Sequence, residues 1–376
     1  VIPYFHTVSC IVFTNDSKIF IRKTNTATLS TDNQTTTNRT KRGLKSSPFS
    51  IIFAKGTARL KAHVRRTRAR RRETTENSMK KQFFLNLSLA LLLCTGTTFA
   101  QRVDTVAVLS PSMHKTVKSV VVLPASYDQS PEKRYPVVYL LHGHGGNYAA
   151  YVNQTRPQLP QDASNMEFIA VCPDGGRDSW YWDSPADPKN RYETFVASEL
   201  VKYIDKHYRT KADRTGRAIT GFSMGGHGAL WLAFRHPETF GACGSMSGGV
   251  DIRPFPDQWG MKRWLGEYAD HPKVWDDYTV ATQLYRLRPE PHVLGGRSND
   301  WLGKSEVRRP AIIIDCGTDD FFYGVNLALH EAMLHNNIAH TFIVRPGSHN
   351  HDYWRNALEY QLLFFHNYFD REAQPQ

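Results

Sequence analysis

The sequence is poor in cysteine. It has five cysteines in 376 residues, and only Cys172, Cys243 and Cys316 follow residue 100. Each of these three stands in or beside an apolar run, which favours buried free thiols over a disulfide framework. Residues 101–376 must therefore depend on a hydrophobic core, and they are numerous enough for one α/β domain with a substantial core.

Acidic residues are scarce in the first hundred positions, where 4 Asp and Glu stand against 18 Lys and Arg. From residue 101 onward, 31 Asp and Glu stand against 29 Lys and Arg. The whole basic excess therefore lies in the first quarter of the chain. Its peak, HVRRTRARRRE at 63–73, lies among Thr, Asn and Ser without sustained apolar periodicity. Nothing there would present a basic patch to nucleic acid, so we expect no such partner and predict that residues 1–78 form a disordered basic leader.

Long apolar runs are also missing, and the run that follows Met79 is too short for a membrane-spanning helix. It begins with two lysines and ends in a small-residue site at Ala100, the pattern of a secretory signal peptide over 79–100 with cleavage after Ala100. We therefore expect a secreted or periplasmic protein with no stable membrane anchor after cleavage. Because a signal peptide begins a chain, we also expect Met79 to be the true start and residues 1–78 to be upstream sequence.

After residue 100, short β-branched runs alternate with longer amphipathic runs. This order predicts a mostly parallel sheet with helices on both faces, an α/β fold. The expected strands are 118–124, 135–143, 167–176, 217–220, 241–249, 310–317 and 340–347, and the expected helices are 193–208, 224–238, 324–337 and 353–369. Residues 250–309 break the alternation and are predicted to be an insertion over the sheet, with its tryptophans mainly in the core.

The stretch TGFSMGGHG, 220–228, places Ser223 between an expected strand and an expected helix. Functional groups of a parallel sheet gather at the C-terminal ends of its strands. A nucleophile elbow needs small residues two positions before and after the serine, because its strained turn brings strand and helix backbones together. Gly221 and Gly225 meet that need, so Ser223 is predicted to be a nucleophile.

A serine nucleophile needs a base and an orienting carboxylate, which follow the serine in that architecture in the order acid, then histidine. The segment IDCGTDDFF offers Asp315, Asp319 and Asp320, and RPGSHNHDYW offers His349 and His351. Both segments follow expected strands and can reach the Ser223 side of the sheet.

The same chemistry needs two backbone N–H groups directed at the developing negative charge. One is expected from Met224, directly after the nucleophile. The other is expected from the loop LLHGHGG, 140–146, whose glycines keep side chains out of the way.

The segments YLLHGHGG, GFSMGGHGAL, CGTDDFF and RPGSHNHDYW together resemble the esterase D-like branch of the α/β-hydrolases. That branch includes the acetyl xylan and feruloyl esterases of carbohydrate esterase family 1, tributyrin esterases, S-formylglutathione hydrolases and mycolyltransferases. The resemblance covers 115–370 and implies an α/β-hydrolase fold. It also implies that Asp320 is the acid, His349 the base and His144 the donor of the second oxyanion N–H.

The segment SWYWDSP, 179–185, resembles the aromatic loop of these esterases. We therefore expect Trp180, Tyr181 and Trp182 to bind substrate, with a place in the core as the alternative.

Rival functions fit these residues less well. A dinucleotide fingerprint from Gly143 would need glycine where Tyr148 stands, and the histidines lack the helical spacing of zinc motifs. We therefore expect neither cofactor nor metal. A binding module that has lost catalysis is disfavoured, because every member of a triad is present.

The sequence thus predicts an exported serine esterase that acts through an acyl-serine intermediate. Export favours acetyl or feruloyl esters of plant polysaccharides as substrates. A short-chain esterase of the tributyrin type, a thioesterase like S-formylglutathione hydrolase and an acyltransferase stay open as alternatives.

Overall fold

The computed structural model of this chain describes residues 49–93, 101–287 and 309–373. It contains two units, Val1–Gly96 and Thr97–Gln376.

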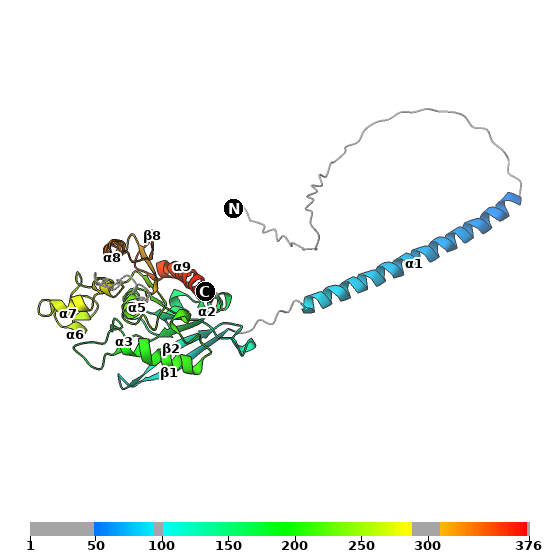
Figure 1. Cartoon of the computed structure of the whole chain (residues 1–376). Helices are drawn as coiled ribbons and strands as arrows, with labels where there is room; N and C mark the ends of the chain where they lie inside the picture. The colour runs from blue at the N-terminus through cyan, green and yellow to red at the C-terminus, as the bar shows by residue number, and fades with distance from the viewer. Residues whose placement is uncertain (1–48, 94–100, 288–308, 374–376) are drawn as a thin grey trace, which may run out of the picture. The chain divides into compact units, whose positions relative to one another are not determined.

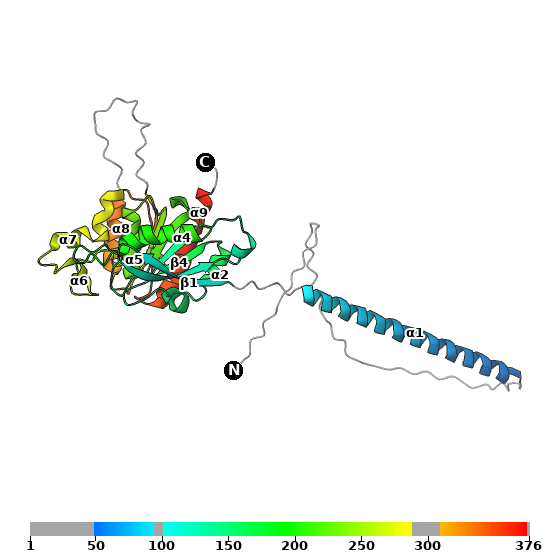
Figure 2. The ribbon, with the colours of Figure 1, turned by 90° about the horizontal axis from the view of Figure 1, so that it is seen from below.

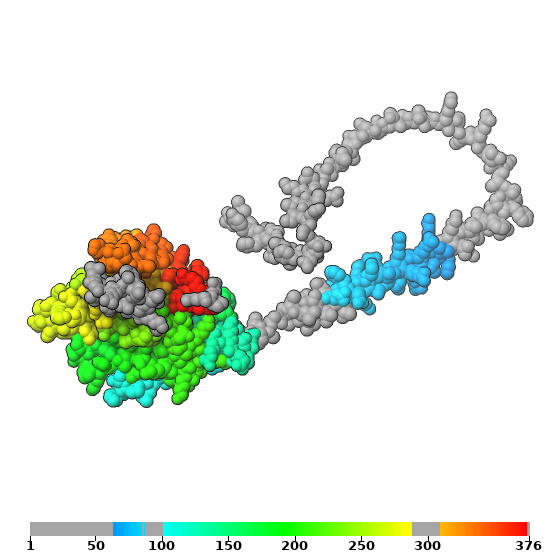
Figure 3. Space-filling model, viewed as in Figure 1, coloured from blue at the N-terminus to red at the C-terminus, as the bar shows by residue number. Residues whose placement is uncertain are grey.

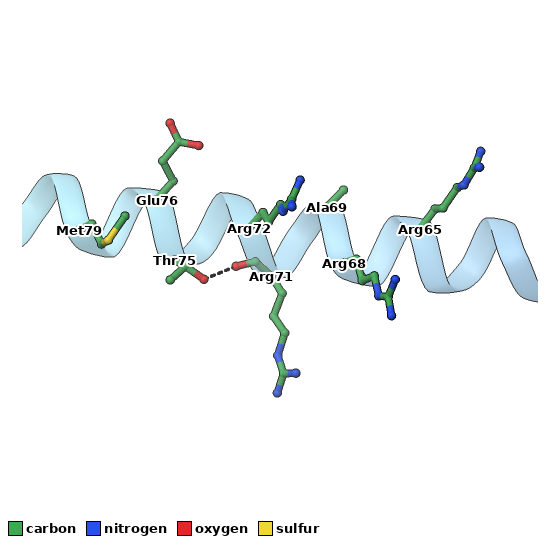
Figure 4. A pocket seen from close by; sticks show the side chains of 8 residues that line it. All are labelled: Arg65, Arg68, Ala69, Arg71, Arg72, Thr75, Glu76 and Met79. Atoms are coloured by element: carbon green, nitrogen blue, oxygen red, sulfur yellow. Dashed lines mark hydrogen bonds between the residues drawn. The ribbon is translucent and has the colours of Figure 1, made fainter.

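The first unit contains one long helix, α1, Phe49–Leu93 (Figure 1). The predicted disorder is therefore wrong for residues 49–78, which are helical, while residues 1–48 lie outside the described residues. Arginine, alanine, lysine and glutamate are strong helix formers, and an i,i+4 ion pair between Lys80 and Glu76 (2.9 Å) adds to their preference. Arg65 and Arg72 leave the helix on one side and Arg68 and Arg71 on the other (Figure 4), so the charge of these four residues does not form a single face.

The expected signal peptide falls mostly on α1. Residues 79–93 are its last turns, whereas the expected cleavage site lies outside the described residues. Among the described helices, none combines the length and the apolar character needed to cross a membrane.

The second unit is built on an eight-stranded sheet with the strand order β1-β2-β4-β3-β5-β6-β7-β8. The strands are β1 Arg102–Ser110, β2 Lys115–Leu123, β3 Val137–Leu141, β4 Ile169–Pro173, β5 Arg217–Gly221, β6 Ala242–Met246, β7 Ala311–Gly317 and β8 Thr341–Arg345. β2 is antiparallel to both of its neighbours, β1 and β4, whereas β3 to β8 are all parallel to one another. The predicted mostly parallel α/β sheet is confirmed. The sequence did not predict β1, an edge strand whose residues are largely exposed.

Helices cover both faces of this sheet. The elements are α2 Leu159–Asn165, α3 Tyr192–Thr194, α4 Val201–His207, α5 Met224–Arg235, α6 Met261–Leu265, α7 Pro272–Asp277, α8 Tyr323–His335 and α9 His351–Glu372, with shorter turns η1 Tyr127–Gln129, η2 Tyr151–Thr155, η3 Phe195–Leu200, η4 Arg214–Gly216 and η5 Val280–Leu287. One apolar core joins the sheet to residues of α4, α5 and α8, and a second joins it to residues of α2 and α9. The buried strands read as nearly continuous apolar runs because both faces are covered.

The predicted insertion lies between β6 and β7 and supplies α6, α7 and η5, while residues 288–308 lie outside the described residues. α6 and α7 lie side by side at one end of the unit (Figures 1 and 2) and form the yellow region of Figure 3. Trp264 and Trp275 are buried as expected, whereas Trp259 is only half-buried. The three cysteines of the unit are buried free thiols, also as expected.

Candidate active site

Ser223 occupies a sharp turn between the end of β5 and the start of α5. Its φ of 57° and ψ of −121° lie in a region that non-glycine residues rarely adopt. The turn is held by backbone hydrogen bonds: Ser223 donates to the carbonyl of Met246 (2.9 Å), and His227 donates to the carbonyl of Ser223 (3.1 Å). The strained conformation places the serine side chain at the carboxyl edge of the parallel strands.

The two glycines that flank Ser223 have no room for a side chain. A Cβ at Gly221 would lie 2.4 Å from the backbone of Gly225, and a Cβ at Gly225 would lie 2.1 Å from the carbonyl oxygen of Leu141. β3, β5 and α5 therefore meet in backbone contact beneath the serine, as the elbow pattern predicts.

Ser223, His349 and Asp320 form a continuous chain of hydrogen bonds. Nε2 of His349 lies 2.8 Å from Oγ of Ser223, and Nδ1 lies 2.9 and 3.0 Å from the two carboxylate oxygens of Asp320. Asp320 follows β7 and His349 follows β8, so neighbouring strand ends bring them together. Asp320 is 5% exposed, and its carboxylate also accepts the N–H of Phe322 (2.8 Å).

The other acidic candidates lie elsewhere. Asp315 is buried and is bound by Arg345 (2.7 Å) and by the hydroxyl of Tyr353 (2.5 Å). Asp319 is exposed. Of the three candidate aspartates, only Asp320 accepts a hydrogen bond from His349.

His351, the other histidine candidate, begins α9. Its Nδ1 lies 2.9 Å from Oγ1 of Thr155, and burial lowers its pKa. Its ring packs against the ring of Phe222, the residue before Ser223.

The expected donors of the oxyanion site lie on two segments at the elbow. Met224 is the first residue of α5, and the N–H of a first helical residue has no acceptor within its helix. Gly143, one residue before His144, lies so close that a Cβ there would be 3.3 Å from Cβ of Ser223. The loop that carries His144 therefore borders the serine, and the His144 ring is half-buried with its pKa lowered by that burial.

His142 fixes this loop in place. Nε2 of its buried ring accepts the N–H of Gly175 (2.8 Å), so Nδ1 carries the proton and donates to the carbonyl of Gly143 (2.8 Å). Burial lowers the pKa of His142 and keeps the ring neutral. Within the described ranges, no three His, Cys, Asp or Glu side chains gather closely enough to hold a metal ion.

The predicted substrate-binding role of Trp180, Tyr181 and Trp182 is not met. Their exposures are 1%, 0% and 0%, so these side chains belong to the core and line no open surface. Trp180 and Tyr181 have positive φ angles of 54° and 62°, a conformation that non-glycine residues rarely adopt. Trp180 then stacks on Trp182 (5.6 Å between ring centroids), and the hydroxyl of Tyr181 donates to the carbonyl of His142 (3.0 Å).

His227 on α5 is a buried residue whose importance the sequence did not reveal. Its Nε2 accepts the indole N–H of Trp182 (2.8 Å), so its Nδ1–H donates to the carbonyl of Gly249 (2.8 Å). Complete burial lowers the pKa of His227 to about 4. The neutral ring therefore ties the helix behind the nucleophile to the start of the insertion.

Aromatic side chains nevertheless reach the active site, from other segments. The ring of Phe321 is 52% exposed and lies 4.2 Å from the ring of His349. Trp259, from the insertion, stacks on Phe321 at 5.6 Å and 19°. We call Phe321 and Trp259 the aromatic shelf. The sequence signal for it was the FF pair directly after Asp320.

The chain matches a family of known sequences over most of the second unit. The profile of the family described as "Putative esterase" matches residues 110–365.

Individual relatives are similar over parts of the chain. An endo-1,4-beta-xylanase/feruloyl esterase of Xylanibacter ruminicola is 34% identical over 150 residues, covering 38% of this chain and 21% of that protein. An acetyl esterase of Caldicellulosiruptor saccharolyticus is 24% identical over 271 residues, covering 67% of this chain and 94% of that protein. In the first curated relatives that the chain matches, the matched part spans 29% of their length or less.

Among solved structures, a ferulic acid esterase is similar with a TM-score of 0.58 and 29% identity. The match covers 72% of this chain and 100% of that chain.

Proposed function

This chain belongs to the esterase family and is a serine esterase family hydrolase, and on that premise we propose that it hydrolyses acetyl or feruloyl esters of plant polysaccharides through an acyl-enzyme on Ser223. The observation that carries the catalytic part is the hydrogen-bonded chain from Ser223 through His349 to Asp320. We propose in addition that the signal sequence at 79–100 directs export.

In the first step, Nε2 of His349 takes the hydroxyl proton while Oγ of Ser223 attacks the ester carbonyl. Asp320 accepts a hydrogen bond from Nδ1–H, which holds the ring in the tautomer whose Nε2 is free to act as a base. The protonated ring then gives its proton to the leaving alcohol. An acyl-serine remains.

The carbonyl oxygen gains negative charge during this step. We propose that the N–H groups of Met224 and His144 stabilise it, because both segments border Ser223 and the donors are held before substrate arrives. Water activated by His349 then attacks the acyl-serine and releases the acid. No step uses a metal or an organic cofactor.

Two observations support a feruloyl substrate. The Xylanibacter relative and the similar ferulic acid esterase structure are both named for that activity. The aromatic shelf places an exposed ring beside His349, where it can stack on an aromatic acyl or sugar group. The acetyl esterase relative supports the smaller acyl group.

The test measures kcat/KM on p-nitrophenyl acetate and methyl ferulate, with Ser223→Ala as the blank. We expect Ser223→Ala to lower kcat by about 10⁶-fold on either ester. A preference for methyl ferulate that Phe321→Ala abolishes would assign the aromatic acyl group. Turnover of the acetate alone would assign the acetyl group or a general short-chain esterase.

Activity retained in Ser223→Ala would contradict the proposed mechanism. Acyl transfer to a sugar that outpaces hydrolysis would instead make the enzyme an acyltransferase, since both reactions share the acyl-serine.

A further inference from the structure

A pocket outside the catalytic triad lies at the carboxyl edge of the sheet. Its volume is about 340 Å³, and its walls come from the start of β2, the loop after β4 and helix α6. β2 is antiparallel to β4, with Ser119 opposite Pro173, so Lys115 lies beyond the carboxyl end of β4. The N–H of Gly145 donates to the carbonyl of Arg177 (2.7 Å), which joins this pocket's wall to the loop that borders Ser223.

Positive charge dominates the walls. Lys115, Arg177, Lys189 and Arg263 line the pocket with only two carboxylates, those of Asp178 and Asp187. Among the residues that the structure describes, none of the four cations has a carboxylate oxygen within 4.0 Å. Unpaired cations gathered in one concave site create a positive potential that attracts anions.

Lys115 is exposed but packs against an aromatic ring. Its Nζ donates to the hydroxyl of Tyr192 (3.1 Å) and stands 4.6 Å from the centre of that ring. Burial lowers its pKa, because the charged form is partly removed from water. The carboxylates of Asp174 and Asp187 oppose this shift from a greater distance, and a bound anion would add to their effect.

Two N–H donors of the walls are also unsatisfied. Nδ2 of Asn190 and Nε1 of Trp264 are buried and have no acceptor among the described residues. Both residues line the pocket. Because neither nitrogen has accessible surface of its own, a ligand in the pocket would reach them only after the wall shifts, so the exposed charged side chains carry the recognition.

The guanidinium of Arg263 is oriented by a neighbouring ring. Its guanidinium lies 4.3 Å from the ring of Trp264, which orients the planar group. A planar guanidinium matches a carboxylate with two parallel hydrogen bonds. The pocket is larger than a carboxylate alone would fill, and the partly exposed carboxylates of Asp178 and Asp187 can accept hydrogen bonds from sugar hydroxyls.

From these observations we propose that the pocket binds a sugar acid, with its carboxylate held by Lys115 and Arg263. This site goes beyond the proposed esterase reaction, because neither its residues nor its ligand takes part in the chemistry at Ser223. It would hold a carboxylated carbohydrate at the same edge of the sheet as the nucleophile.

The test is isothermal titration calorimetry of the full chain with D-glucuronate at fixed ionic strength. D-glucose serves as the neutral ring of similar size, and inorganic phosphate serves as an anion without a ring. We expect saturable binding of D-glucuronate that Lys115→Gln and Arg263→Gln each weaken about tenfold or more. Lys202→Gln, an exposed lysine on α4, is the matched control and should bind D-glucuronate as the unchanged chain does.

Circular dichroism of each variant checks that it folds, and both substituted side chains lie at the surface. The proposal is overturned if D-glucuronate does not bind, if D-glucose binds equally well, or if neither pocket variant weakens binding. Binding of phosphate without binding of D-glucuronate would overturn the assignment to a sugar acid. Because no substrate turnover is measured, failure of this site and failure of the esterase proposal are distinguishable.

Discussion

At the scale of single residues, the site depends on which of several similar side chains faces which partner. Two adjacent aspartates follow β7, yet Asp320 is 5% exposed and bound to His349, whereas Asp319 is exposed. The pair therefore offers a matched comparison within one loop.

Asp320→Asn should lower kcat by about 10⁴-fold, because an amide no longer holds His349 in the required tautomer. Asp319→Asn should leave kcat unchanged. Both values come from steady-state kinetics on p-nitrophenyl acetate. Equal losses in the two variants would refute the assignment of the acid.

The titration of His227 affects the stability of the whole second unit. Its pKa is about 4 in the folded chain against an ordinary value near 6.5, so the unfolded chain binds more protons between these pH values. The free energy of unfolding should therefore fall as the pH drops from about 6.5 to about 4. At about 1.4 kcal/mol for each pH unit in that window, the loss from His227 is on the order of 3 kcal/mol.

Urea unfolding of the unchanged chain and of His227→Gln at several pH values measures this effect. Glutamine does not titrate, so the free energy of unfolding of the variant should change less steeply with pH, by the equivalent of about one proton. The variant nevertheless starts from a lower stability at pH 7. The other buried histidines contribute equally to both curves. Identical slopes would show that His227 does not titrate in this range.

At the scale of elements, the elbow depends on backbone contact among β3, β5 and α5. Gly225 lies at that contact, whereas Gly324 on α8 has no heavy atom within 4 Å of an added Cβ. The same substitution should therefore have opposite effects at the two positions.

Gly225→Ala should destabilise the fold by at least about 2 kcal/mol and abolish labelling of Ser223 by a fluorophosphonate, since the elbow must shift. Gly324→Ala should be neutral or stabilising by up to about 1 kcal/mol, because alanine favours the helix. Urea unfolding and probe labelling measure both. A normal elbow in Gly225→Ala would contradict the close packing described above.

At the scale of the whole molecule, the two units have separate structures. Helix α1 exposes its described side chains between 63 and 84, whereas the second unit has two apolar cores of its own. The site residues all belong to the second unit.

A chain that begins at Gln101 should therefore keep the Tm and the esterase activity of the full chain. Differential scanning calorimetry and turnover of p-nitrophenyl acetate compare the two. A lower Tm in the shortened chain would mean that the first hundred residues stabilise the second unit.

Local sequence determined the elements and the elbow. Apolar runs bounded by turn residues predicted the parallel strands, and the glycines around Ser223 predicted the strained turn, because both depend on neighbours along the chain. The first unit shows the limit of such reasoning, since its composition suggested disorder where residues 49–78 are helical.

Tertiary structure decided what depends on segments far apart in the sequence. Strand order alone left three aspartates and two histidines open, and the resemblance to known esterases pointed to Asp320 and His349. The packing of β7 against β8 is what brings these two side chains together. It also sends Trp180 and Trp182 into the core and places Phe321 and Trp259 beside the active site. The physical reason is that the burial of a side chain depends on the segments that fold around it. The sequence alone therefore does not tell whether an aromatic residue contacts a substrate or another ring.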